Sequence, residues 1–182
     1  MPINATNPML PVGTAAGVRI RPVDPADADG LAEFYACLSP ESRYRRFMGT
    51  SRGLPPDASR LLCTPDHQHA EGLVAVLETP GPGDGLIVGH LCLVATGGDA
   101  LELAVAVADA HQRHGIGRRL FVEALAWARR SQIRIITATA FADNRPALRL
   151  LDSAPEGTTV RTSQGDVVSV EIPLRQPSES ET

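Results

Sequence analysis

The stretch Leu101-Glu-Leu-Ala-Val-Ala-Val-Ala-Asp-Ala-His-Gln-Arg-His-Gly-Ile-Gly-Arg-Arg-Leu120 is the most informative part of this sequence. Its first eight residues are mostly apolar and small, and at a period of two they predict a β-strand. A polar segment follows, and from Gly115 to Ser131 the apolar residues recur at helical spacing. The stretch therefore predicts a strand, a loop and a helix in direct succession.

The start of that helix is suited to an anion. A helix N-terminus presents successive backbone N–H groups, and the helix dipole adds a favourable potential for negative charge. Glycines such as Gly115 and Gly117 let a phosphate approach the backbone without obstruction from a Cβ atom. The loop alone favours a phosphate or pyrophosphate site, although two glycines could equally serve as turn and packing residues.

Outward from this centre, the sequence predicts one strand, three helices and two strands upstream, and a strand, a short helix and a hairpin downstream. Two of the upstream helices begin with a capping residue followed by proline. Glycine- and proline-rich segments at 80–85 and 97–99 are expected to turn the chain between strands. The expected elements other than the central strand and helix lie at 17–21, 24–38, 39–48, 55–63, 72–79, 86–96, 133–141, 144–152, 157–162 and 167–174.

This order predicts an α+β fold with a mixed, mainly antiparallel sheet and helices on both faces. The chain has 182 residues, 43% of them hydrophobic, which suits one domain. We expect that domain to span residues 17–174, with a flexible arm over residues 1–16 and a loose tail over residues 175–182.

The charged residues and cysteines exclude several kinds of chemistry. All 17 basic residues are arginine, so a Schiff-base lysine and a Walker phosphate loop are both excluded. The net charge of -4 disfavours nucleic-acid binding, and no apolar segment reaches the ~20 residues that span a membrane. Three scattered cysteines form no metal or redox motif and suit a reducing cytoplasm.

Two motifs resemble those of the GNAT N-acetyltransferase superfamily. The segment Gln112-Arg-His-Gly-Ile-Gly117 resembles its Gln/Arg-x-x-Gly-x-Gly/Ala signature, and lies after the fourth strand as it does in that family. The segment Asn144-Arg-Pro-Ala-Leu-Arg-Leu-Leu151 resembles its second motif, and the resemblance extends over residues 17–174. Leu38-Ser-Pro-Glu-Ser-Arg-Tyr-Arg-Arg-Phe-Met48, together with Glu102 ten residues before Gln112, resembles the bacterial protein-lysine acetyltransferase branch.

The resemblance implies a sheet that splays between its fourth and fifth strands and direct transfer of an acetyl group from acetyl-CoA to an amine. No metal is implied. A protein lysine is the favoured acceptor; a small amine, or a non-catalytic acyl-CoA-sensing domain, is the alternative, and a homodimer is left open. Pyrophosphate would lie on the amides of 113–118, and the pantetheine arm along 105–107. The cofactor-binding residues implied are Val105, Ala106, Val107, Gln112, Arg113, His114, Gly115, Ile116, Gly117, Arg118 and Asn144.

Glu102 is the candidate general base. A lysine-type amine has a pKa near ~10.4, so it must lose a proton before it attacks the thioester. At a period of two, Glu102 shares a strand face with the small residues Ala104 and Ala106, which leaves space for a ligand. The alternative is a solvated charge at a strand end. Leu151 occupies the position where the family often has an acidic tyrosine, so no general acid is assigned.

Four other features have a simpler interpretation that we prefer. The arginines at 43, 45 and 46 predict a solvated helix face, with an acidic partner or the CoA 3′-phosphate as alternatives. His67 and His69 predict a polar loop rather than a metal site. His111 and His114 are expected to face solvent beside the phosphate loop. Trp127 is expected in the core.

Overall fold

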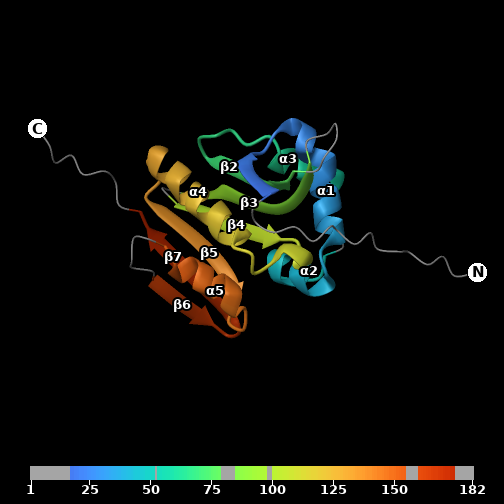
Figure 1. Cartoon of the computed structure of the whole chain (residues 1–182). Coiled ribbons are helices and arrows are strands. Elements are labelled where there is room, and N and C mark those ends of the chain that lie inside the picture. The colour runs from blue at the N-terminus through green and yellow to red at the C-terminus, as the bar shows by residue number, and fades with distance from the viewer. Residues whose placement is uncertain (1–16, 52, 79–84, 98–99, 155–159, 175–182) are drawn as a thin grey trace, which may run out of the picture.

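The computed structural model describes residues 17–51, 53–78, 85–97, 100–154 and 160–174 (Figure 1). The expected arm over 1–16, the expected tail over 175–182, and most of the turns at 80–85 and 97–99 lie outside these ranges, so they stay predictions. The elements are β1 (Val18–Pro22), η2 (Pro25–Asp27), α1 (Ala28–Cys37), α2 (Pro40–Phe47), α3 (Pro56–Leu62), β2 (Ala70–Leu77), β3 (Leu86–Gly97), β4 (Ala100–Val107), η3 (Asp109–His111), α4 (Ile116–Arg130), β5 (Ile135–Phe141), α5 (Arg145–Asp152), β6 (Val160–Gln164) and β7 (Val167–Pro173).

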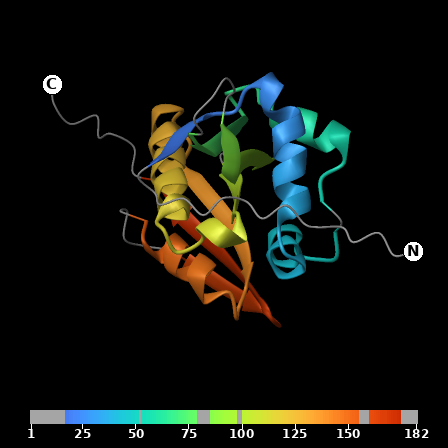
Figure 2. The same ribbon diagram turned by 45° about the vertical axis from the view of Figure 1, so that its right-hand side comes forward.

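The predicted fold class is confirmed. Within the described residues, seven strands form one sheet in the order β1-β2-β3-β4-β5-β7-β6, in which only the β4–β5 pair is parallel. Figure 2 shows α4 and α1 on opposite sides of the sheet. No described helix is both long and apolar enough to cross a membrane.

Most element boundaries shift from the prediction by one or two residues, and two elements differ more clearly. The polar residues after Thr162 were expected to form a loop, but β6 continues to Gln164, which pairs with Val167. Gly165 has a φ of 63°, and this left-handed conformation closes the hairpin in two residues. At the other end of the chain, the expected helix 24–38 is divided into the short 3₁₀ turn η2 and α1.

The hydrophobic core lies on both faces of the sheet, under α1 on one side and α4 on the other. Fully buried side chains from helices and strands meet there: Leu31, Tyr35, Leu91, Leu93, Ile116, Leu120, Phe121, Leu125, Ile136 and Ile172. Trp127 packs against this core, as predicted. The first turns of α4 come close to β3 at Gly89, where a Cβ atom would lie 3.2 Å from Leu120 and 3.3 Å from Ile116.

We expect Gly89→Ala to destabilise the fold by roughly 1–3 kcal/mol, the usual cost of overpacking a tight core. The added methyl group would also press on Ala75 at 3.2 Å, so α4 has to move away from the sheet. Denaturant unfolding measures the loss. Gly17→Ala is the control, because a Cβ atom there meets its nearest neighbour at an ordinary 3.8 Å. Equal stability of the two variants would show that α4 does not depend on this close approach.

Candidate functional site

The sheet opens between β4 and β5. Parallel pairing joins Ala100 to Ile135, Leu101 to Ile136 and Glu102 to Thr137, and does not continue past that third pair. Beyond it, β4 stays paired with β3 as far as Val107, and β5 stays paired with β7 as far as Phe141. The predicted splay is therefore present, and Glu102 is the last residue of β4 that is joined to β5.

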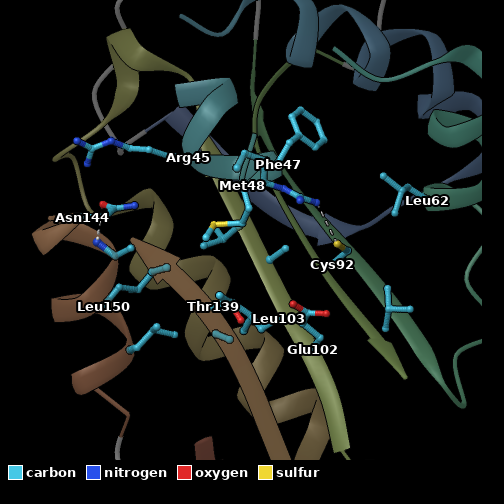
Figure 3. Close-up of a pocket in the computed structure, with 18 residues that line it drawn as sticks. Arg45, Phe47, Met48, Leu62, Cys92, Glu102, Leu103, Thr139, Asn144 and Leu150 are labelled. Carbon is cyan, nitrogen blue, oxygen red and sulfur yellow. Dashed lines mark hydrogen bonds between the residues drawn. The ribbon is translucent and has the colours of Figure 1, made fainter. Parts of the chain in front are cut away.

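A cleft of about 430 Å³ lies at this opening, and we call it the splay cleft (Figure 3). Side chains from two helices of the N-terminal half, from three strands and from α5 surround it. Its lining residues are Arg45, Arg46, Phe47, Met48, Leu62, Cys92, Val94, Glu102, Leu103, Ala104, Val105, Ala138, Thr139, Ala140, Asn144, Ala147, Leu150 and Leu151. Most of these side chains are apolar, so a charged group that enters the cleft meets few competing polar partners.

The edge of β4 presents free backbone groups to the splay. The N–H of Ala108 bonds to Val88 on β3, whereas the carbonyl of Leu101 accepts a bond from Thr137 on β5. Because strand residues alternate, Leu103 and Val105 turn their N–H and C=O groups toward the opening. Ala106 has the opposite parity, so its backbone faces β3. An extended ligand chain could bond along β4 as an additional strand does.

Glu102 occupies the floor of the splay cleft. Its side chain is exposed, has no hydrogen-bond partner among the described residues, and points into the cleft in Figure 3. Ala104, on the same face, also lines the cleft, as the strand period predicted. A carboxylate with free lone pairs beside small side chains can accept a proton directly or through one water.

The N-terminus of α4 provides uncommitted N–H donors near one end of this opening. Its cap residue, Gly115, has a φ of 81° and no capping side chain, and the first helical bond runs from Arg119 to Gly115. The N–H groups of the first three helical residues therefore have no acceptor within the helix. A Cβ atom on Gly117 would point at Val107 and Leu150, so this glycine faces the splay. The geometry fits an anion at the helix start.

The loop before α4 is braced against α2. Asp109 accepts hydrogen bonds from the backbone N–H of Ser39 at 2.9 Å and from the hydroxyls of Ser39 and Ser42, each at 2.7 Å. Burial opposes ionisation of Asp109, but these bonds outweigh it and hold its pKa below the ordinary value. Gln112 donates to Ser42 at 3.2 Å and to the carbonyl of Val107 at 3.1 Å. The side chain of Gln112 thus occupies the carbonyl of Val107, the last residue of β4.

The opposite side of α2 contacts the end of β5, across the opening from β4. Tyr44 stacks on Phe141 at the end of β5, with ring centroids 5.1 Å apart and planes inclined by 4°. Arg45 forms ion pairs with Glu41 at 2.8 Å and with Asp143 at 3.6 Å. The hydrogen bonds of Asp109 and Gln112 hold α2 to the loop after β4. The helix α2 therefore crosses the open end of the sheet between β4 and β5.

The predicted solvated face of three arginines is wrong. Arg43 donates to the carbonyls of Ala36 and Leu38 at the end of α1, and Arg45 is ion-paired as described. Arg46 turns inward, where it donates to Tyr35 Oη at 3.2 Å and to Cys92 Sγ at 3.4 Å. The helix is strongly polar in sequence, yet each of these three arginines is held by at least one group outside α2.

His111 was also predicted wrongly, because it is fully buried. The short turn η3 tucks its ring inward and leaves the neighbouring Asp109 and Ala110 outside. His114 is exposed, as expected. His67 and His69 contact Glu71 and Asp66, each at 3.0 Å. Among the described residues, no three His, Cys, Asp or Glu side chains converge as metal ligands.

The other predicted residues fall into two groups. Val105 and Asn144 line the splay cleft, and Asn144 Oδ1 also caps α5 by accepting from the N–H of Ala147 at 3.3 Å. The remaining predicted cofactor residues lie at the end of β4, in the loop or in the first turn of α4 rather than in the cleft wall: Ala106, Val107, Gln112, Arg113, His114, Gly115, Ile116, Gly117 and Arg118. Leu151 lines the cleft, where the family often has a tyrosine.

A larger hollow of about 740 Å³ lies between β1 and α4. Two of its charged residues, Arg19 and Glu78, already pair with each other at 3.5 Å. It also adjoins Gly115 and contains Glu123, but its strand, β1, is an outer strand of the sheet and does not border an opening between two strands. We therefore place the site at the splay cleft.

The chain is similar to known proteins in family and fold. The model of the acetyltransferase (GNAT) family matches residues 31–153. The GNAT domain of a PAT from Streptomyces lividans ("S. lividans PAT") is 27% identical, covers 86% of this chain and 90% of its own, and superposes with a TM-score of 0.75. The yncA protein of Salmonella typhimurium, solved with acetyl-CoA, is 20% identical over 91% of this chain and 98% of its own, with a TM-score of 0.66.

A third structure is of an enzyme named for a small amine. The spermidine N-acetyltransferase of Vibrio cholerae, in complex with CoA and spermine, is 15% identical over 87% of this chain and 96% of its own, with a TM-score of 0.65. At 15% and 20% identity, the Vibrio and Salmonella structures establish the shared fold. No curated protein sequence matches the chain significantly.

We expect Asp109→Ala to loosen the loop before α4, because three hydrogen bonds to α2 lose their acceptor. A loss of about 1 kcal/mol corresponds to roughly fivefold faster amide hydrogen exchange over residues 112–118. Asp166→Ala, at the distant β6–β7 turn, is the control. In the wild type the brace should persist down to the ordinary aspartate pKa of ~3.9 and be lost only below it, since the pKa of Asp109 is lowered. Unchanged exchange in the variant would contradict the brace.

Proposed function

The chain belongs to the GNAT acetyltransferase family, and we propose that it acetylates lysine side chains of proteins. As a family member it is an acetyl-CoA-dependent acetyltransferase. The observation that carries the assignment of the site is the opening of β4 from β5 directly after Glu102, which brings a free strand edge, a free helix N-terminus and a free carboxylate together.

The described residues fit acetyl-CoA. Pyrophosphate would be held by the backbone N–H groups from Arg113 to Arg118, where the helix dipole favours negative charge. The pantetheine arm would bond to the N–H and C=O groups of Val105 and to the N–H of Val107, whose carbonyl is already taken by Gln112. Ala106 would contribute only its small side chain, because its backbone faces β3. When bound, acetyl-CoA supplies the activated acetyl group as a thioester.

Glu102 would act as the general base. An acceptor ammonium has to lose a proton before its nitrogen can attack, and Glu102 lies on the cleft floor with its lone pairs unoccupied. Direct transfer needs no enzyme nucleophile. No general acid is proposed, since Leu151 stands where the family often has a tyrosine.

Two observations favour a protein lysine as acceptor. The segment 38–48 resembles the protein-lysine acetyltransferase branch, and the Streptomyces PAT domain has the highest identity of the structures compared above. The cleft wall around Glu102 is largely apolar, with Leu62, Cys92 and Val94, and suits the aliphatic stem of a lysine. Small amines remain the second candidate, because the Vibrio enzyme of the same fold acts on spermidine.

A cytoplasmic location is part of the same proposal. All three cysteines are free, and Cys63 and Cys92 are buried, which suits a reducing compartment. Acetyl-CoA and protein lysines would both be available there. Fractionation of cells that produce the protein tests the location.

We expect acetyl-CoA at 100 times its dissociation constant to stabilise the wild type by ~2.7 kcal/mol, and ATP or NAD at equal concentration to do much less. Gly117→Glu should abolish this stabilisation, because it adds bulk and negative charge at the splay end of the helix. Gly117→Ala is the matched control: its Cβ atom has ordinary contacts of 3.7 and 3.8 Å and should preserve binding. A folded Gly117→Glu that binds normally would place the anion elsewhere.

We expect Glu102→Gln to lower turnover by ~10²–10⁴-fold, the usual contribution of a positioned general base, and to leave acetyl-CoA affinity nearly unchanged. Wild-type turnover should fall toward low pH as the acceptor amine becomes protonated. Raising the pH should partly rescue the variant, since more amine is then neutral. Full activity in Glu102→Gln would make this residue a strand-end charge.

The acceptor is tested by release of free thiol from acetyl-CoA with a panel of protein and small-amine acceptors. Faster turnover with lysine-containing proteins than with spermidine or free amino acids supports the proposal. The reverse preference favours the small-amine function. Tight acetyl-CoA binding without turnover on any amine favours an acyl-CoA-sensing domain.

A further inference from the structure

Arg46 places a fixed positive charge in the wall of the splay cleft. Besides its hydrogen bonds to Tyr35 and Cys92, its guanidinium carbon lies 5.6 Å from the ring centroid of Tyr35 and 5.2 Å from that of Phe47. In Figure 3 a dashed line at Cys92 marks the bond to Arg46. Four contacts from three different elements therefore hold the guanidinium in one orientation.

The groups that hold Arg46 do not neutralise it. Burial raises the pKa of Tyr35 to about 12 and also raises the pKa of Cys92, so the phenol and the thiol keep their protons near pH 7. Behind Tyr35, its hydroxyl lies 2.8 Å from Nδ1 of His90, and burial lowers the pKa of that histidine to about 3. The immediate surroundings of Arg46 on α1 and β3 are therefore uncharged.

Glu102 on β4 is the carboxylate that faces Arg46 across the cleft. Burial opposes the charge on Arg46, but its hydrogen bond to Tyr35 and the negative charge of Glu102 favour it, and its pKa remains above the ordinary value. Among the described residues, no ion pair within 4.0 Å joins Glu102 to Arg46. A space therefore separates a free carboxylate from a fixed cation.

Most hydrogen-bonding capacity of Arg46 is still available. A guanidinium carries five N–H donors, and the bonds to Tyr35 and Cys92 use two of them in the described part of the chain. A half-buried charge without a carboxylate in contact is costly, so its presence in a cleft wall indicates a functional role. The space between Glu102 and Arg46 suits a group that releases a proton on one side and gains negative charge on the other.

We propose that Arg46 stabilises the negative charge that develops on the acetyl carbonyl oxygen during transfer. This inference rests on the proposed function. The amine nitrogen bonds to the carbonyl carbon, and the C=O electron pair moves onto the oxygen, toward the N–H donors of Arg46. That pair returns as the C–S bond breaks and the thiolate of CoA leaves. The proton of the amine passes to Glu102 and then to solvent.

Arg46→Met tests the proposal, because it keeps an unbranched stem against Tyr35 and Phe47 and removes the charge and donors. Loss of a donor to a developing oxyanion typically lowers turnover ~10²–10³-fold, and we expect that fall in kcat on the pH-independent plateau. Acetyl-CoA affinity should not change. Arg46→Lys should recover part of the rate, since it restores the charge without the planar fork. Arg130→Met, exposed at the far end of α4, is the matched control.

Three results for Arg46→Met would overturn the proposal. The first is an undiminished kcat, and the second is an effect confined to KM for the acceptor. The third is a pH profile of kcat whose acidic side is shifted while its pH-independent plateau keeps the wild-type value. If Arg46→Met does not fold, Tyr35→Phe provides the test, because it removes only the hydroxyl that orients Nε of Arg46. An unchanged kcat on the pH-independent plateau of Tyr35→Phe would then overturn the proposal. A wild type without turnover on any amine would overturn the proposed function and this inference together. Wild-type turnover with an equally active Arg46→Met would overturn this inference alone.

Discussion

The site depends on the end of β4–β5 pairing after Glu102 and Thr137. Each strand keeps its outer partner, so the sheet remains continuous while its centre opens. Unpaired backbone groups in a dry interior are costly, and here they border a cleft that admits solvent or a ligand. The opening therefore leaves a hydrogen-bonding edge free, which in our proposal binds the pantetheine arm, while the N-terminus of the helix that follows β4 would bind the anion.

The segment α2 connects the parts around that opening. Its first turn binds the loop before α4 through Ser39 and Ser42, its middle reaches β5 through Tyr44, and its last turn contributes Arg46 to the cleft wall. The two sequence motifs at 38–48 and 112–117 are thus in direct contact through Ser42 and Gln112, and Asp109 adds bonds from the turn before the second motif. One eight-residue helix therefore joins the loop before α4 to the cleft wall that contains Arg46.

Local patterns sufficed for the order of elements, the loop before α4 and the position of Glu102, because periodicity and glycine placement act within a few residues. They did not suffice for Arg46 or His111. The sequence of α2 is strongly polar, so its arginines were expected on a solvated face. None of its eight residues, all of them described, is fully buried. The partners that turn Arg46 inward, Tyr35 and Cys92, lie 11 and 46 residues away. Only the three-dimensional arrangement reveals such contacts.

The separation of Glu102 from Arg46 keeps both charged groups available to a substrate. In direct contact the two charges would satisfy each other, and neither would remain available to a substrate. Tyr35, Cys92 and the ring of Phe47 hold the guanidinium by neutral contacts, which fix its direction and preserve its field. The apolar lining of the cleft strengthens that field, because little competing polarity surrounds it. Leu151 stands where the family often has a tyrosine, and a fixed cation, which needs no proton transfer, would be one means of stabilising negative charge there.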